Sequence, residues 1–323
     1  MRAVAAALIV FLATASPALA NPDAWRGEWP ETDFSRHSVA WNEILSGGPP
    51  KDGIPAIDDP VFEPDAAITS LDPREPVVTV EIDGDRRAYP LRILMWHEIV
   101  NDTVGGVPVS VTYCPLCNSA VVFDRRVGDA VLDFGTTGKL RNSDLVMYDR
   151  QSESWWQQFL GEAIVGEYTG TLLEMIPVRV ESFARFRERG GGQVLVPNNA
   201  FGRRYGQNPY RGYDGRSRPY PHLYMGGLPD DIAPLSRVVV VGEQAWALAL
   251  LREARRIEAG DLVLTWEPGQ ASALDSVYIA EGRDIGNVVV QRRTDDGLVD
   301  AVHDVSFAFA FRAFRPDGTI HTE

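Results

Sequence analysis

Apolar and polar residues alternate in short blocks along most of the chain, a pattern that predicts a fold rich in β-strands. Residues 77–90 form two such blocks around Asp83-Gly84-Asp85, which predicts two strands joined by a tight turn. Residues 91–100 carry apolar side chains at helical spacing and predict one short helix. The apolar run at 107–113 predicts a buried strand that leads into the first cysteine.

Further strands are expected after the cysteines, and an irregular arm before residue 75. Residues 120–134 predict a hairpin around Gly128-Asp129, and residues 145–149 predict one more strand. The segment that follows the N-terminal apolar run is rich in Pro, Gly and Asp. This composition favours irregular structure, with one short helix near residues 34–45.

The second half of the chain resembles the first at several places. Residues 237–248 have the pattern of the strand–turn–strand unit at 77–91, and residues 265–273 align with 112–120 without a gap. This similarity predicts an α+β, mainly β fold built from two degenerate copies of one β-rich unit with short helices; the alternative is chance similarity between short strands. The expected division is a signal peptide at 1–20, an irregular N-terminal arm at 21–74, a first β-rich unit at 75–197, a linker at 198–229 and a second β-rich unit at 230–323.

The chain has two cysteines, and both lie in one short loop, Cys114-Pro115-Leu116-Cys117. A disulfide across two intervening residues removes little entropy from the unfolded chain, so it stabilises a large domain only weakly. Local chemistry explains the pair better than a plain structural bridge, either as two ligands of a soft metal or as a dithiol redox couple. The second copy has Glu267 and Gln270 in their place, so the predicted loop does not need a disulfide to hold its shape.

His97 is the histidine nearest to this pair in the sequence and lies on the predicted helix before the cysteine-bearing strand. A neutral imidazole beside two thiolates would complete a three-ligand set for copper or zinc. Met147, in a predicted neighbouring strand, offers a thioether that suits Cu(I). His97 has two ordinary alternatives, a core histidine bonded to the backbone or a cap at the C-terminus of the helix. The ordinary alternative for Met147 is a core methionine. We expect copper first and zinc second, held by Cys114, Cys117, His97 and Met147.

Several carboxylates near these residues have two interpretations. They can orient a metal-bound imidazole through hydrogen bonds, or they can serve as capping and turn acceptors in solvated positions. These residues are Glu98, Asp102, Asp144 and Asp149.

Some familiar kinds of site do not fit the sequence. A thioredoxin-type cysteine pair opens a helix, whereas the residues after Cys117 are β-branched or aromatic and predict a hairpin. A structural zinc site needs four protein ligands, and the chain has one cysteine pair. The sequence has no Walker-type phosphate loop, Gly-x-Ser-x-Gly or His-Glu-x-x-His, which removes the common hydrolase and zincin hypotheses.

The first twenty residues have the pattern of a secretory signal peptide. Met1-Arg2 precedes an apolar run at 3–15, and Ala18-Leu19-Ala20 is a cleavage signature. We expect cleavage after Ala20 and a periplasmic or secreted protein with no transmembrane segment in the mature chain. The net charge of -14 disfavours nucleic acid and anionic membranes as partners. A metal ion or a redox partner protein is expected instead.

A long motif surrounds the cysteines and continues beyond them. Its residues are His97-Glu98-Ile99-Val100-Asn101-Asp102, Gly105-Gly106, Pro108-Val109, Val111-Thr112-Tyr113-Cys114-Pro115-Leu116-Cys117, Ser119-Ala120, Val122-Phe123-Asp124-Arg125, Ser143-Asp144-Leu145-Val146-Met147-Tyr148-Asp149-Arg150, Ser154, Trp156 and Gln158. This motif resembles that of the bacterial and archaeal DUF3179 family over most of residues 75–225, and more weakly in the C-terminal part. Asn118 departs from the family pattern, which favours Gly there. The family name states no activity, so the resemblance implies a shared Cys-Pro-x-Cys loop and no mechanism.

Three functions follow from these residues. The first is an exported soft-metal protein of the cell envelope, copper first, that handles metal or transfers electrons through the cysteine pair. The second is a periplasmic thiol-disulfide oxidoreductase that uses the same pair. The third is a non-catalytic envelope binding module with residues 198–229 as its recognition surface. The sequence favours neither an enzyme nor a non-enzyme.

Overall fold

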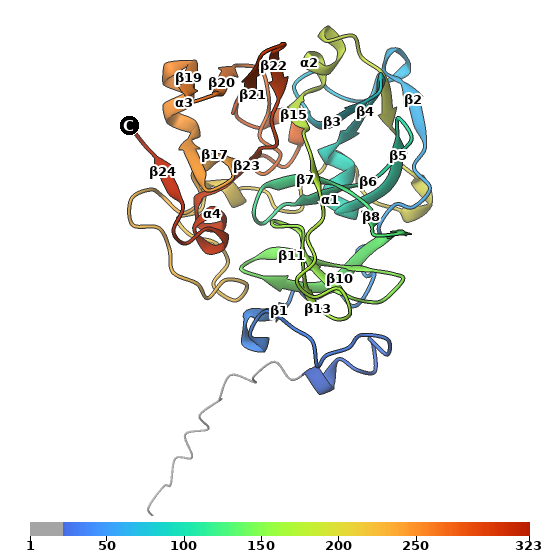
Figure 1. Ribbon diagram of the computed structural model, residues 1–323. Coiled ribbons are helices and arrows are strands. Elements are labelled where there is room, and N and C mark those ends of the chain that lie inside the picture. Colours follow the sequence, from blue (N-terminus) through green and yellow to red (C-terminus); the bar gives the residue numbers. More distant parts are fainter. Residues whose placement is uncertain (1–21) are drawn as a thin grey trace, which may run out of the picture.

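The computed structural model describes residues 22–323, and over this range the fold is mainly β. Five sheets of four or five strands are arranged in the manner of a five-bladed β-propeller (Figure 1). A separate two-stranded hairpin consists of β8 (Arg126–Val127) and β9 (Ala130–Val131). The predicted signal peptide, 1–20, lies outside the described residues.

The first sheet has the strand order β15-β3-β4-β16-β2. Its centre is the predicted hairpin, in which β3 (Pro76–Ile82) and β4 (Asp85–Pro90) run antiparallel. The other strands are β15 (Arg179–Ser182), β16 (Gln193–Leu195) and β2 (Phe62–Pro64). The helices α1 (Leu91–His97) and α2 (Phe183–Glu188) follow β4 and β15 directly.

The second sheet, in the order β14-β7-β6-β5, carries the cysteine loop. It consists of β5 (Ile99–Val104), β6 (Val107–Cys114), β7 (Ser119–Asp124) and β14 (Met175–Ile176). The predicted helix at 91–100 is shorter in the structure. Glu98 has a φ of 59°, which ends α1 and turns the chain into β5.

The third sheet has the order β1-β10-β11-β12-β13. Its strands are β1 (Ile44–Ser46), β10 (Phe134–Arg141), β11 (Asp144–Asp149), β12 (Trp155–Gln157) and β13 (Glu162–Val165). Of the short helix predicted near residues 34–45, the structure has a 3-10 helix at Trp41–Glu43, and the segment then ends in β1, which pairs with β10. The hairpin predicted at 120–134 is divided between β7, the small β8–β9 pair and the start of β10.

The last two sheets belong to the C-terminal part. One has the order β23-β17-β18-β24, with β23 (Asp304–Phe307), β17 (Arg237–Val241), β18 (Gln244–Ala247) and β24 (Thr319–His321). The other has the order β19-β20-β21-β22, with β19 (Arg256–Ala259), β20 (Leu262–Glu267), β21 (Asn287–Thr294) and β22 (Gly297–Asp300). The helices are α3 (Leu248–Ala254) and α4 (Ala308–Phe314). Short 3-10 helices lie at Pro22–Ala24, Trp41–Glu43, Asp65–Ala67, Asn199–Phe201, Tyr213–Gly215 and Ile279–Glu281.

The mainly β content fits the prediction, but the division into two degenerate copies is wrong. Five sheets do not divide into two equal units, and the sheet around β10 and β11 has no counterpart in residues 230–323. The gapless alignment also fails. Cys114 pairs with Ser119 across a short turn, whereas Glu267 pairs with Asn287 across the long loop 268–286. The loop in the second half therefore says nothing about whether the cysteine loop needs a disulfide.

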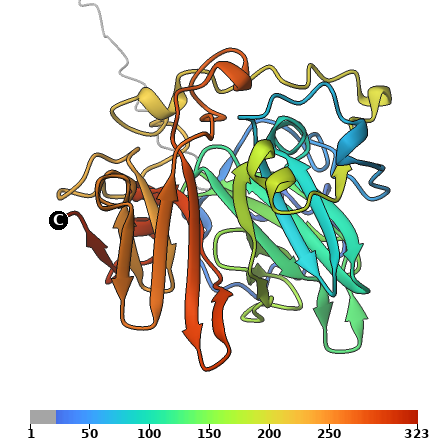
Figure 2. The same ribbon diagram turned by 90° about the horizontal axis from the view of Figure 1, so that it is seen from above.

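The largest hydrophobic cluster joins the two ends of the described chain. Val78 in β3, Cys114 in β6 and Phe309 in α4 are all buried members of it. Figures 1 and 2 show the C-terminal sheets, in orange and red, beside the N-terminal sheets in cyan and green, and β23 contacts β7 directly. The cysteine loop is thus packed inside the fold. Within residues 22–323, no helix has the length and apolar character needed to cross a membrane.

Candidate metal centre

The cysteine loop is a tight turn between two antiparallel strands, as predicted. Residues 115–118 join β6 to β7, and no helix begins at Cys117. The amide of Asn118 donates to Pro115 O at 3.3 Å and closes the turn. Asn118 has a φ of 52°, a conformation that Gly adopts freely and that Asn tolerates better than most residues. This conformation explains why Asn118 can occupy a position where the family pattern favours Gly.

A second hairpin turn faces the cysteine loop. Asn142 and Ser143, between β10 and β11, have φ values of 53° and 62°, the signature of a type I′ turn. Both carbonyl groups point at the thiols: Ser143 O lies 3.6 Å from Cys114 Sγ, and Asn142 O lies 3.9 Å from Cys117 Sγ. Asp144 is the first residue after this turn, so its carboxylate is delivered to the same place.

Two thiols and one carboxylate meet between these turns. The sulfurs of Cys114 and Cys117 and a carboxylate oxygen of Asp144 all lie within 4.8 Å of one another. All three side chains are buried, and both cysteines are free thiols. In the part of the chain that the structure describes, this is the one group of three or more His, Cys, Asp or Glu residues close enough to share a metal ion.

The carboxylate of Asp144 is held by one oxygen and unsatisfied at the other. Its Oδ2 accepts hydrogen bonds from Gln157 Nε2 at 2.6 Å and from the Phe159 amide at 2.9 Å. Its Oδ1 is buried and has no hydrogen-bond partner among residues 22–323. A buried polar atom without a partner is costly unless something binds it. Oδ1 is therefore the oxygen free to serve as a ligand.

Burial keeps protons on the acidic groups of the site. Burial raises the pKa of Asp144 to about 7, and it raises the pKa of both thiols above their usual range. It also raises the pKa of the nearby Glu98 to about 8, with the charge of Asp144 as the second cause. A bound cation would reverse this balance, because metal ligation favours the deprotonated forms and releases the protons.

The structure does not bring His97 to the thiols. Its Nδ1 lies 2.7 Å from Pro55 O and its Nε2 lies 2.8 Å from the Tyr205 hydroxyl, so both ring nitrogens are engaged. The ring also stacks on Tyr205 and meets Phe201 edge-on. His97 lies outside the group formed by the thiols and Asp144. The structure matches one of the ordinary alternatives, a hydrogen-bonded histidine in the core.

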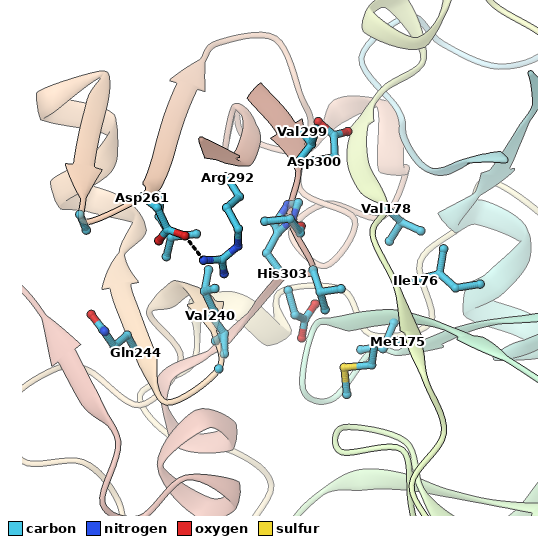
Figure 3. Close-up of a pocket in the computed structure, with 18 of the residues that line it drawn as sticks. Met175, Ile176, Val178, Val240, Gln244, Asp261, Arg292, Val299, Asp300 and His303 are labelled. Carbon is cyan, nitrogen blue, oxygen red and sulfur yellow. Dashed lines mark hydrogen bonds and ion pairs between the residues drawn. The ribbon is translucent and has the colours of Figure 1, made fainter. Parts of the chain in front are cut away.

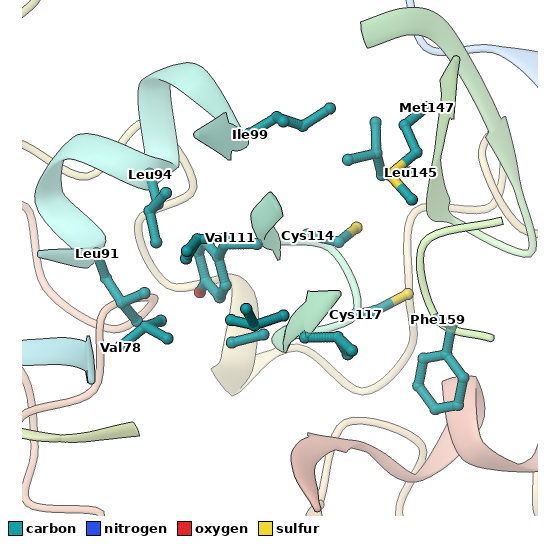
Figure 4. Close-up of a cluster of buried hydrophobic side chains, with 14 of the residues drawn as sticks. Val78, Leu91, Leu94, Ile99, Val111, Cys114, Cys117, Leu145, Met147 and Phe159 are labelled. Atoms are coloured by element: carbon teal, nitrogen blue, oxygen red, sulfur yellow. The ribbon is translucent and has the colours of Figure 1, made fainter. Parts of the chain in front are cut away.

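Met147 does share the region of the thiols. It is fully buried in β11 and belongs to the same hydrophobic cluster as both cysteines. Figure 4 shows its thioether on the same side of the structure as the sulfurs of Cys114 and Cys117, with Leu145 beside it. A third sulfur therefore belongs to the same buried cluster as the two thiols.

Two other carboxylates of the motif, Asp102 and Asp149, have structural partners. Asp102 accepts hydrogen bonds from Arg87 and from the Tyr89 hydroxyl. Asp149 accepts hydrogen bonds from Ser152 and from Trp156 Nε1. Neither belongs to the group at the thiols. The sequence left the role of Asp144 ambiguous, and the structure places this residue at the site. The sequence feature that pointed to it was its place in the Ser143–Arg150 block of the family motif.

Residues 198–229 cover the site. The Ser143 hydroxyl, in the turn that faces the thiols, donates to Leu223 O at 2.9 Å. Tyr213 is fully buried and Tyr224 nearly so, and both belong to the cluster that contains the cysteines. The segment expected to be a linker therefore packs against the thiol region.

Comparison with known proteins identifies the family and no relative of known activity. The family described as "Protein of unknown function (DUF3179)" matches residues 51–318, which is most of the chain. No curated protein and no solved structure gives a match. The motif around Cys114 and Cys117 and the extent of this match lead to one conclusion, that the chain belongs to the DUF3179 family.

Proposed function

We propose that this protein binds one thiolate-preferring transition metal ion through Cys114 and Cys117, with Cu(I) as the first candidate, and that it handles metal or transfers electrons in the cell envelope. The observation that supports this function is the buried group of two thiols and a carboxylate within 4.8 Å, with Asp144 Oδ1 unpartnered. Placement in the envelope rests on the secretory pattern of residues 1–20.

Charge alone does not choose between copper and zinc. Two thiolates around Cu(I) carry a net charge of −1, and two thiolates with the Asp144 carboxylate around Zn²⁺ carry the same charge. The donor atoms differ, because Cu(I) favours sulfur whereas Zn²⁺ accepts a carboxylate oxygen as well. The thioether of Met147, in the same buried cluster as the thiols, favours Cu(I). With Cu(I), a protonated Asp144 donates a hydrogen bond to a thiolate, whereas with Zn²⁺ its carboxylate is a ligand.

A thiol-disulfide oxidoreductase is supported less well by the same residues. Such an enzyme needs an exposed thiolate that can attack a disulfide of its partner. Here Cys114 is 2% exposed and Cys117 is 0% exposed, and burial raises the pKa of both thiols. Both properties suit a metal ligand, since the metal itself drives deprotonation.

Metal content of the purified protein tests the proposal. We expect about one metal ion per chain in protein purified from the periplasm, and none in the Cys114→Ser/Cys117→Ser variant. Asp129→Asn is a matched control, because it changes one residue in an exposed turn away from the thiols. Protein that contains no metal and binds neither Cu(I) nor Zn²⁺ in titrations would refute the proposal. A disulfide between the two cysteines in that protein would favour the oxidoreductase.

A further inference from the structure

A cavity lies beside β7, the strand that follows the cysteine loop. Its volume is about 860 Å³, within the range of small-molecule sites. Met175, Ile176 and Val178 form one side of it, whereas Val240 and Arg292 belong to the opposite side (Figure 3). The cavity therefore lies where strands of the N-terminal and C-terminal parts face each other, a common place for ligand sites.

The wall of this cavity is mainly aliphatic, and its charged groups are already paired. Arg292 forms an ion pair with Asp261, and Asp300 accepts two hydrogen bonds of 2.6 Å from Arg179. Arg315 pairs with Glu243 at 3.1 Å. A charged ligand would find no unpaired countercharge among these groups. A neutral ligand would be matched by the apolar side chains.

Asp304 also lines the cavity, and one of its oxygens is held by backbone amides. Its Oδ1 accepts hydrogen bonds from the Ala120 amide at 3.0 Å and the Val305 amide at 2.9 Å. Its Oδ2 is buried and has no hydrogen-bond partner among residues 22–323. Asp304 thus fixes the start of β23 to the start of β7.

His303 supplies one free polar atom of the cavity. It lies at the centre of Figure 3 and is 9% exposed. Its Nδ1 lies 2.9 Å from Ala301 O. A carbonyl oxygen only accepts, so Nδ1 carries the proton in the neutral ring and Nε2 is an acceptor. Burial lowers the pKa of His303, which favours this neutral form. Nε2 has no partner among residues 22–323.

We propose that this cavity binds a neutral, largely apolar small molecule that donates one hydrogen bond, from a hydroxyl or N–H group, to His303 Nε2. The aliphatic wall provides most of the binding energy through the burial of apolar surface. The hydrogen bond orients the ligand and selects molecules that carry one donor. This proposal does not depend on the metal site, although Phe159 lines the cavity while its amide holds Asp144.

Three naphthalene probes with the same ring system test the proposal. They are 2-naphthol, which is neutral and has one donor, 2-methoxynaphthalene, which has none, and 2-naphthoate, which is an anion. We expect the full chain to bind 2-naphthol about 3- to 10-fold more tightly than 2-methoxynaphthalene in calorimetric titrations, the range that one hydrogen bond supplies. It should bind 2-naphthoate more weakly than either neutral probe.

Two variants assign the binding to this cavity. His303→Phe keeps the ring and removes the acceptor, so the preference for 2-naphthol over 2-methoxynaphthalene should disappear. Ile176→Trp fills the cavity and should weaken the binding of both neutral probes. The comparison of the three probes on the unmodified protein tests the proposal even if a variant folds poorly. Equal binding of 2-naphthol and 2-methoxynaphthalene, tightest binding of 2-naphthoate, or no binding of any probe would overturn the proposal.

Discussion

A carboxylate oxygen of Asp144 lies within 4.8 Å of the sulfur of Cys117, although the two residues belong to different hairpins in different sheets. The contact arises because two tight turns face each other, one between β6 and β7 and the other between β10 and β11. Each turn needs residues that tolerate positive φ, and Asn118, Asn142 and Ser143 provide them. The residues that permit these two turns thus determine where the two thiols and the carboxylate lie.

Replacement of Asp144 should separate the two candidate metals. Asp144→Asn removes the ionisable oxygen and keeps the shape of the side chain, so Zn²⁺ affinity should fall by about tenfold or more. Cu(I) affinity should change much less, because sulfur atoms provide its ligands. Competition titrations with chromogenic chelators measure both affinities. Asp129→Asn should leave both unchanged. Equal losses for the two metals would show that Asp144 acts by supporting the site as a whole.

Replacement of Met147 should have the opposite selectivity. Met147→Leu keeps the volume of this fully buried side chain, so its cost in stability should stay below about 1.5 kcal/mol. Loss of the thioether should weaken Cu(I) binding and leave Zn²⁺ binding unchanged. The same chelator titrations, with a denaturation curve for each protein, test this expectation. An unchanged Cu(I) affinity would assign Met147 to the core alone.

The parts of the site that could be predicted from the sequence are local. The turn after Cys114 could be predicted because β-branched and aromatic residues follow Cys117 and favour a strand. The assignment of His97 as a ligand rested on closeness in the sequence. Glu98 reverses the chain directly after His97, and the imidazole turns to Pro55 and Tyr205 instead. Closeness in the sequence therefore did not bring the ring to the thiols.

The position of Asp144 at the site and the arrangement of the sheets both depend on contacts between segments that are distant in the sequence. The sequence places Asp144 after a turn, but how that turn docks against Cys117 is decided by tertiary packing. The same holds for the sheets, because β1 pairs with β10 and β15 pairs with β3 across long stretches of chain. Similar strand patterns at 77–91 and 237–248 suggested two copies, since local patterns cannot reveal the sheet that lies between them.

The buried histidine His97 should make stability depend on pH. Burial lowers its pKa, whereas in the unfolded chain its pKa lies near the usual value of 6.5. Below that pH, His97 is protonated in the unfolded chain but stays neutral in the folded protein. Protonation therefore stabilises the unfolded state, and the free energy of unfolding decreases as the pH falls. His303 acts in the same direction, and the carboxyl groups with raised pKa act in the opposite one.

A difference measurement isolates the contribution of His97. His97→Gln cannot titrate, and it should be less stable than the unmodified protein at pH 8 because the hydrogen bonds to Pro55 and Tyr205 are weakened. The gap in unfolding free energy between the two proteins should shrink as the pH is lowered from 8 to 5. Urea titrations at several pH values measure it. A gap that stays constant would mean that His97 is protonated equally in both states.

The cluster that joins the two ends of the chain should make unfolding cooperative. Phe309 in α4 is fully buried, and its ring lies 4.9 Å from Tyr224 and 6.3 Å from Phe307, centroid to centroid. Phe307 in turn donates its amide to Cys117 O at 2.9 Å, so packing around Phe309 supports the thiol loop. Phe309→Ala leaves a cavity in this cluster and should cost about 3–5 kcal/mol. Leu298→Ala, at a side chain that is 44% exposed, is the control and should cost less than about 0.5 kcal/mol.

Urea unfolding of Phe309→Ala should remain a single transition at a lower midpoint, seen equally by tryptophan fluorescence and near-ultraviolet circular dichroism. The reason is that Val78, Cys114 and Phe309 share one core, so the C-terminal sheets cannot loosen without exposing the N-terminal ones. Residues 230–323 contain no proposed ligand of the metal site. Their deletion should nevertheless yield a chain that fails to fold. Two separate transitions, or a soluble folded fragment 22–229 that still binds metal, would show instead that the thiol site belongs to a unit that is stable without the C-terminal sheets.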